Sequence, residues 1–227
     1  MADLIITIDG PAASGKSTAA RLLARKVGAS FLDTGAMYRA VTLAAMRAGI
    51  DLNDEQELLD ITQKCDFQFS EQVGKMTVHI DGSDVTEQIR DPEVTVNARY
   101  IAVAPKVRDH LVQMQRQFAV SRQKIVTEGR DQGTVAFYDA DIKFFLTADL
   151  TERAGRRQAE LRAKGIDGDL EQIQEAIEKR DESDESRAVG PLKPAEDAIV
   201  VDTTNMSIEQ VVEKLSGYVK EKCSKKT

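Results

Sequence analysis

The residues Gly10-Pro11-Ala12-Ala13-Ser14-Gly15-Lys16-Ser17 fit the phosphate-binding pattern GxxxxGK[ST] without a mismatch. Its glycines permit a tight turn whose backbone N–H groups point at phosphate oxygens, and the following helix adds its positive end. We expect Gly10 to Thr18 to bind ATP, with Lys16 reaching the β- and γ-phosphates and the Ser17 hydroxyl binding Mg²⁺. The alternative is a glycine-rich turn with an exposed lysine.

Two later segments combine arginine with strand-to-loop positions. Asp33-Thr34-Gly35-Ala36-Met37-Tyr38-Arg39 places a hydroxyl at a helix start and an arginine one turn on, which predicts a second anion site. Glu128-Gly129-Arg130-Asp131-Gln132-Gly133-Thr134 follows a predicted strand, where ligands of open α/β sheets bind. The alternatives are a capping threonine with a solvated arginine, and a structural turn with a local ion pair.

A third group of charges lies between residues 151 and 194. Arg153, Arg156 and Arg157 share one helical stretch, and Arg180, Asp184 and Arg187 fall on one helical face. An enzyme that joins two phosphate-bearing substrates needs several converging arginines to offset their repulsion. Taken alone, the group would more simply be a solvated helix surface.

These motifs must be positioned by a parallel α/β sheet. Five apolar runs without alternation predict strands buried on both faces, and they cover 4–8, 29–32, 124–127, 142–146 and 198–201. Segments with helical spacing separate them, which is typical of a P-loop NTPase fold with a five-stranded parallel sheet. Residues 67–89 alternate instead and predict an antiparallel insertion of about three strands. The charged 151–194 region, interrupted at 165–168, predicts a mobile helical lid.

Composition narrows the classes of partner. With 31 basic and 38 acidic residues in 227, we expect no nucleic-acid or membrane partner. No apolar run has the length of a membrane span, and Cys65 and Cys223 have no metal or disulfide spacing. We therefore expect a cytoplasmic protein with free thiols, and we expect a monomer.

Together with Pro105-Lys106-Val107-Arg108, the motifs at 10–18, 33–39, 128–134 and 180–187 resemble the bacterial cytidylate kinase family over nearly the whole chain. The resemblance implies one domain, 1–227, with three parts. They are a CORE at about 1–35, 105–150 and 190–227, an NMP-binding part at about 36–104 and a LID at about 151–189. The implied reaction converts ATP and CMP or dCMP to ADP and CDP or dCDP.

The same resemblance implies roles for individual residues. Thr34, Arg39 and Arg130 would bind the acceptor phosphate, while Arg108 and Asp131 would read cytosine. A carboxylate can accept from the cytosine N4 amine and a guanidinium can donate to O2 or N3. Further acceptor contacts would come from the lid residues Arg180, Asp184 and Arg187. The lid cluster of Arg153, Arg156 and Arg157 would close over the ATP phosphates, and the catalytic set would be Lys16, Arg130, Arg153, Arg157 and Arg180.

Two positions depart from the family pattern. Ala13 stands where the loop usually has glycine, which is tolerable unless the residue needs a positive φ. Arg99 stands where a small serine usually helps to hold the base, so Arg99 becomes a candidate CMP contact that alters base selectivity, or else points to solvent. Asp33 and Glu128 could hold metal-bound waters, which spacing alone does not decide.

Three functions remain to be compared. The leading prediction is a CMP/dCMP kinase with direct in-line transfer. A kinase for UMP, AMP or shikimate is the nearest rival, and a P-loop nucleotide-sensing switch is the rival from another class. The switch lacks an NKxD-type guanine-reading segment in this sequence.

Overall fold

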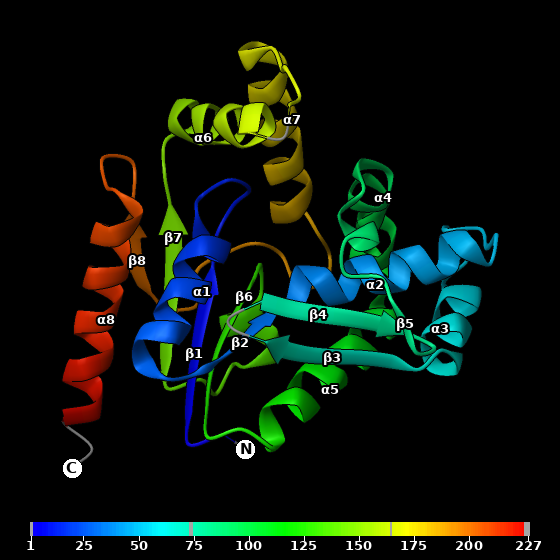
Figure 1. The fold of residues 1–227 in the computed structure, drawn as a ribbon, viewed down its shortest axis with the longest axis horizontal. Coiled ribbons are helices and arrows are strands. Elements are labelled where there is room, and N and C mark those ends of the chain that lie inside the picture. The colour runs from blue at the N-terminus through cyan, green and yellow to red at the C-terminus, as the bar shows by residue number, and fades with distance from the viewer. Residues whose placement is uncertain (1, 73–74, 164, 225–227) are drawn as a thin grey trace.

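A computed structural model of the chain describes residues 2–72, 75–163 and 165–224. Its centre is a parallel sheet in the order β2-β6-β1-β7-β8 (Figure 1). The strands are β1 (Leu4–Asp9), β2 (Ser30–Asp33), β6 (Lys124–Gly129), β7 (Ile142–Thr147) and β8 (Ile199–Asp202). All five predicted strands are confirmed, and β1 is buried at every position, as expected for a strand with helices on both faces.

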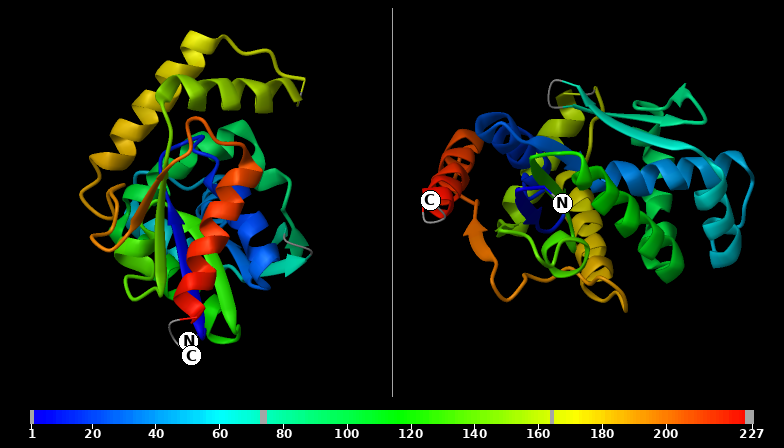
Figure 2. Two further views of the ribbon diagram at one scale, coloured as in Figure 1. Left: turned by 90° about the vertical axis from the view of Figure 1, so that its left-hand side faces the viewer. Right: turned by 90° about the horizontal axis from the view of Figure 1, so that it is seen from below.

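Helices cover both faces of this sheet (Figure 2). On one face, α1 (Lys16–Val27) and α8 (Ile208–Ser224) pack on β1, β7 and β8 around Ile6, Leu23 and Leu215. On the other face, Ile5, Leu32 and Ile125 join a larger core that includes α2 (Thr34–Arg47) and α5 (Pro105–Val120). This larger core extends away from the sheet and carries the insertion.

The insertion contains the predicted three-stranded antiparallel sheet, β3 (Phe67–Gln72), β4 (Lys75–Ile80) and β5 (Ser83–Asp84). Met76, Val78 and Ile80 of β4 are buried while the residues between them are not, which matches the period of two in the sequence. The remaining elements of the insertion are α3 (Glu55–Lys64), the 3₁₀-helix η1 (Gln88–Arg90) and α4 (Pro92–Val103).

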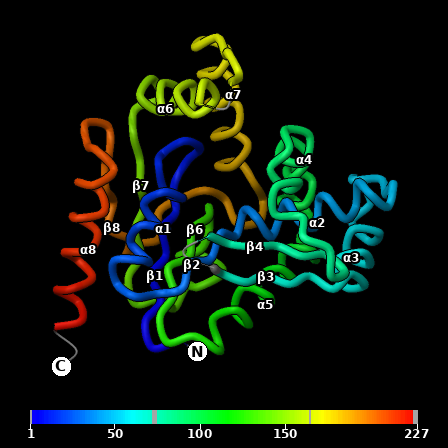
Figure 3. Tube along the Cα trace, viewed as in Figure 1, coloured from blue at the N-terminus to red at the C-terminus, as the bar shows by residue number. Residues whose placement is uncertain are grey.

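After β7 the chain leaves the sheet and forms two helices above the carboxyl ends of the strands (Figure 3). These are α6 (Leu150–Ala163) and α7 (Leu170–Glu185), and the chain then returns to β8. Between β6 and β7 lies a single π-helical turn, η2 (Gln132–Ala136). The ends of β1, β2 and β6 meet at one edge, since Asp9 pairs with Gly129 and Asp33 with Glu128. The predicted motifs therefore share one edge of the sheet.

Two further findings bear on the sequence predictions. No helix among the described residues is long and apolar enough to span a membrane. In the part of the chain that the structure describes, neither Cys65 nor Cys223 is in a disulfide.

Candidate active site

The loop from Gly10 to Ser17 joins β1 to α1 in the geometry of a phosphate cradle. A Cβ on Gly10 would collide with the Leu146 carbonyl, so only glycine fits there. Gly15 has φ 83° and caps α1 without a side-chain hydrogen bond, which leaves the first N–H groups of the helix for a ligand. Ala13 has φ 58°, so the departure noted in the sequence falls on a residue that does need a positive φ. The predicted loop is therefore present, with local strain at Ala13.

Lys16 is buried at the base of this loop, with Nζ 3.3 Å from the Pro11 carbonyl oxygen. Burial lowers the pKa of Lys16 to about 7, and the neighbouring Arg130 adds to the effect, while Glu128 opposes it. Burial and the neighbouring arginine thus disfavour the charged form of Lys16. The negative charge of a bound phosphate would favour it.

Oxygen ligands for a metal ion lie next to the loop. The Ser17 hydroxyl donates to Glu128 Oε1 at 2.7 Å, and Glu128 is buried beside Asp33. Mg²⁺ takes oxygen ligands and keeps several waters, so one hydroxyl and two carboxylates beside a phosphate cradle fit it. In the described part of the chain, no group of three or more His, Cys, Asp or Glu side chains could hold a metal by itself. The donor set suits an ion that arrives with a nucleotide.

Arg108 of α5 and Asp131, which follows the end of β6, form a buried ion pair. Their side chains are 3% and 7% exposed, and Arg108 also donates to the Ala102 carbonyl at 3.2 Å. Arg108 Nε is buried without a partner in the structure as described, and the Tyr38 ring lies 5.8 Å from the guanidinium carbon. A guanidinium and a carboxylate are thus held side by side, as the cytosine-reading prediction requires.

A second cluster of cations lies between this pair and Lys16. Arg130 Nε donates to Asp184 Oδ2 at 2.6 Å, and Arg187 pairs with the same carboxylate. Arg39 lies 3.4 Å from Asp33, and the Nε atoms of Arg39 and Arg187 are buried without partners in the described structure. Strands and helices far apart in sequence therefore bring unpaired donors together.

Arg180 belongs to the same cluster by its electrostatics. Burial lowers the pKa of Arg180 to about 10, with Arg130 as the next cause. Arg180 is exposed overall on α7, and the charges that act on its guanidinium also include Asp184, Arg39 and Arg187. Within the described residues, Arg180 has no ion pair, which leaves it available for an anion.

Thr34 lies at the first position of α2, but it does not cap the helix. Asp33 does so by accepting from the Ala36 N–H at 2.8 Å. The Thr34 hydroxyl donates to the Glu128 carbonyl at 2.7 Å, which ties α2 to the end of β6. The capping alternative considered for Thr34 is therefore wrong.

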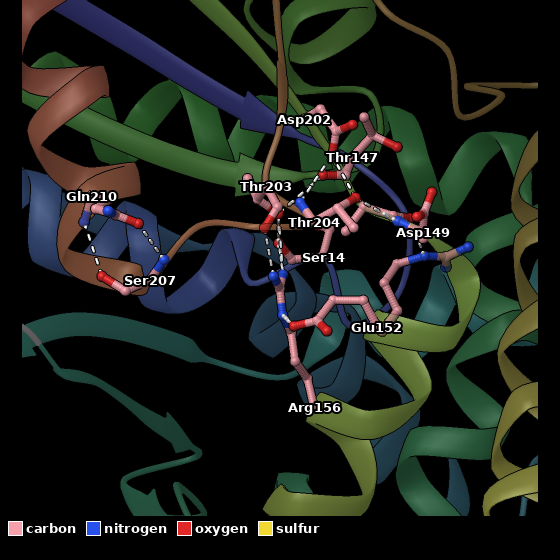
Figure 4. A network of polar contacts seen from close by, with 12 residues as sticks. Ser14, Thr147, Asp149, Glu152, Arg156, Asp202, Thr203, Thr204, Ser207 and Gln210 are labelled. Atoms are coloured by element: carbon pink, nitrogen blue, oxygen red, sulfur yellow. Dashed lines mark hydrogen bonds and ion pairs between the residues drawn. The ribbon is translucent and has the colours of Figure 1, made fainter.

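The three lid arginines differ in where they point. Arg156 Nη2 donates to the Thr203 carbonyl at 2.6 Å, and Arg156 Nη1 lies 3.4 Å from the Ser14 carbonyl oxygen. Arg156 therefore lies against the phosphate loop (Figure 4). Arg157 pairs with Glu160 at the surface, with its side chain 40% exposed. Arg153 is buried and pairs with Asp181.

Arg99 lies outside the pocket as the side chains are arranged here. It is exposed on α4, its guanidinium carbon is 4.9 Å from the Tyr100 ring centroid, and Nη2 donates to the Tyr100 hydroxyl. Of the two alternatives left open for Arg99, the structure favours the solvent-facing one.

Sequence reasoning missed two residues that shape the site. Asp9 accepts from the backbone N–H groups of Gln132 and Gly133 at 2.9 and 2.8 Å, so it fixes the loop that carries Arg130 and Asp131. Gly190 has φ 60°, and a Cβ there would collide with Arg108 and Asp131. The only available signals were a carboxylate directly before the phosphate loop and a glycine directly after the lid.

Known proteins resemble the chain over nearly its full length. A family model described as cytidylate kinase matches residues 6–221. The cytidylate kinase of Actinobacillus succinogenes is 43% identical over 225 residues, covering 96% of this chain and 99% of its own. The cytidylate kinase of Lactobacillus gasseri is 42% identical over 217 residues, covering 96% and 94%.

Among solved structures, a gluconokinase from Sinorhizobium meliloti superposes with a TM-score of 0.51 at 14% identity, covering 98% of this chain and 95% of its own. That likeness shows a shared fold alone. The family match and the curated relatives show more: the chain belongs to the cytidylate kinase family.

Proposed function

We propose that this protein transfers the γ-phosphoryl group of ATP to CMP and dCMP, giving ADP with CDP or dCDP. The observation that carries the proposal is the buried Arg108–Asp131 pair, which lies beside a cluster of arginines where the buried Nε atoms of Arg39 and Arg187 have no hydrogen-bond partner in the described structure. Cytosine offers an amine to a carboxylate and two acceptors to a guanidinium. Membership of the cytidylate kinase family supports the same reaction.

The proposed donor site is the loop Gly10 to Thr18, with Lys16 at the β- and γ-phosphates and Arg156 and Arg157 of the lid closing above it. Arg156 already lies against the loop, while Arg157 would have to leave Glu160. Ser17 would bind Mg²⁺ directly, with Glu128 and Asp33 holding its waters. When bound, that ion would neutralise charge on the phosphates.

The proposed acceptor site places the CMP phosphate among Thr34, Arg39, Arg130 and Arg180, with Arg187 nearby and Asp184 toward the ribose. An oxygen of this phosphate attacks the γ-phosphorus in line while the bond to the β–γ bridging oxygen breaks. The attacking oxygen is already anionic near neutral pH, so no strong general base is needed. The chain contributes positioning, charge neutralisation and exclusion of water.

Three parts would divide this work. The CORE, at about 1–35, 105–150 and 190–227, would hold ATP. The NMP-binding part, at about 36–104, and the LID, at about 151–189, would close on the acceptor. Family membership does not favour the UMP, AMP, shikimate or switch alternatives, and the monomeric state and cytoplasmic location stay predictions.

The test is a coupled assay of ADP release with ATP, Mg²⁺ and one acceptor at a time: CMP, dCMP, UMP, AMP, GMP or shikimate. The proposal expects the highest kcat/KM with CMP and dCMP, and almost none in a Lys16→Met variant. A preference for another acceptor would overturn the acceptor assignment. If no acceptor stimulates ADP release above slow hydrolysis, the switch hypothesis would replace the kinase.

A further inference from the structure

The lid and the phosphate loop are joined by a buried polar contact at Ala12. The Ala12 N–H donates to Asp181 Oδ1 at 3.1 Å, and Arg153 Nη1 donates to the Ala12 carbonyl at 3.1 Å. Arg153 and Asp181 also pair with each other, with side chains 10% and 12% exposed. One peptide position of the loop is therefore held from both sides by an ion pair from α6 and α7.

The guanidinium of Arg153 is directed into this contact. Its Nε donates to the Ala148 carbonyl at 3.0 Å, and its Nη1 serves both Ala12 and Asp181. Only Nη2 is without a hydrogen bond in the structure as described. An arginine commonly binds phosphate through two parallel N–H groups, and the Nε and Nη1 groups of Arg153 are already used.

An apolar contact accompanies the polar one. Ala12, Ala154 and Ile177 form a small buried cluster separate from the two main cores, so one residue from each lid helix packs on the loop. Ala154 follows Arg153 on α6, and Ile177 lies one turn before Asp181 on α7. The lid helices are thus attached to the loop at residue 12 and extend away from it (Figure 2).

We infer that Arg153 and Asp181 are positioning residues that couple the conformation of the phosphate loop to the position of the lid. The inference rests on the proposed function and changes one predicted role, because Arg153 would act through Asp181 and Ala12 instead of touching ATP. When phosphate orders the loop, the pair transmits that order to both lid helices. A lid held in this way excludes water from the phosphoryl group, and a loosened lid admits it.

A double-mutant cycle tests the coupling. The variants Arg153→Met, Asp181→Asn and their combination are assayed for CDP formation and for ATP hydrolysis with CMP present. We expect each single change to raise the fraction of ATP lost to water by about tenfold, since either one breaks the same contact. The combined variant should lose no larger a fraction of ATP to water than the worse of the two single variants.

The opposite assignment predicts a different pattern. If Arg153 binds ATP phosphates, Arg153→Met alone would lower kcat/KM for ATP, Asp181→Asn would leave it near the original, and their effects would multiply. Arg153→Lys also separates the two assignments. Lysine keeps the charge for phosphate but cannot hold Ala12, Ala148 and Asp181 together, so the coupling inference expects no rescue. Rescue by lysine, or multiplying effects, would overturn it.

Glu175 and Lys179 supply the matched control. They form an ion pair on the same helix, 3.6 Å apart, with side chains 69% and 77% exposed. Glu175→Gln and Lys179→Met should leave both transfer and hydrolysis unchanged. Thermal melts show whether each variant is folded. If the unmodified protein does not phosphorylate CMP at all, the proposed function fails. If it does phosphorylate CMP but the effects of the two substitutions multiply in the double variant, only the coupling inference fails.

Discussion

Replacing Ala13 with glycine should relieve strain in the phosphate loop. Ala13 has φ 58°, and the left-handed region costs an alanine about 1–2 kcal/mol. Glycine adds freedom to the unfolded chain, which costs about 0.4–1 kcal/mol. Ala13 is half-buried against the Ala12 cluster, so losing its methyl group costs roughly half of the ~0.8 kcal/mol for full burial. With the middle of each range, Ala13→Gly should stabilise the folded state by about 0.4 kcal/mol.

Ala12→Gly is the matched control, because Ala12 is buried but lacks a positive φ. Ala12→Gly relieves no backbone strain. Its folded state should lose about 1.5 kcal/mol of stability, from the added freedom of the unfolded chain and from the lost burial of a methyl group. The two variants should therefore differ by about 2 kcal/mol, or about 4–8 °C in Tm for a chain of this size. Differential scanning calorimetry without nucleotide measures this. If Ala13→Gly melts as low as Ala12→Gly, the strain argument is wrong.

Two further predictions concern residues that shape the acceptor side. Gly190→Ala should raise the KM for CMP by about tenfold or more and leave the KM for ATP unchanged, because the new Cβ would collide with Arg108 and Asp131. Steady-state kinetics measures both constants, and equal changes would contradict the reasoning. Burial raises the pKa of Asp9 to about 7 from 3.8, so the folded state keeps a proton that the unfolded state releases between these values. Stability from this group is present below pH 4 and is lost as the pH rises through 7, by at most about 1.4 kcal/mol per pH unit. Urea unfolding from pH 5 to 7.5 should show this slope reduced in Asp9→Asn, and an unchanged slope would contradict it.

The sequence predicted the elements well, because strands buried on both faces leave continuous apolar runs and the insertion leaves an alternating one. The run 142–146, for example, became β7 at Ile142–Thr147. The phosphate loop was predictable for a similar reason, because the residues that form it are neighbours in the sequence. The departure at Ala13 was visible for the same reason, and the structure adds that this position has a positive φ.

The missed features depend on contacts between distant segments. Gly190 matters only because the chain passes directly over Arg108 and Asp131 on its way from the lid to β8. Asp181 looked like one of many carboxylates on a charged helix, and its pairing with Arg153 and Ala12 arises from how α6 and α7 cross the phosphate loop. Side-chain direction was also beyond the sequence, as the surface position of Arg99 shows.

Whether Asp131 reads the base is tested by comparing kcat/KM for CMP with kcat/KM for UMP, in the unmodified protein and in Asp131→Asn. UMP presents an acceptor where CMP presents the N4 amine, so a carboxylate should favour CMP by about 1–3 kcal/mol, or roughly 5- to 160-fold. An asparagine offers both a donor and an acceptor, and the CMP:UMP ratio should then fall by about that factor. An unchanged ratio in a folded variant would show that Asp131 does not read the base, and the proposed acceptor site would be wrong.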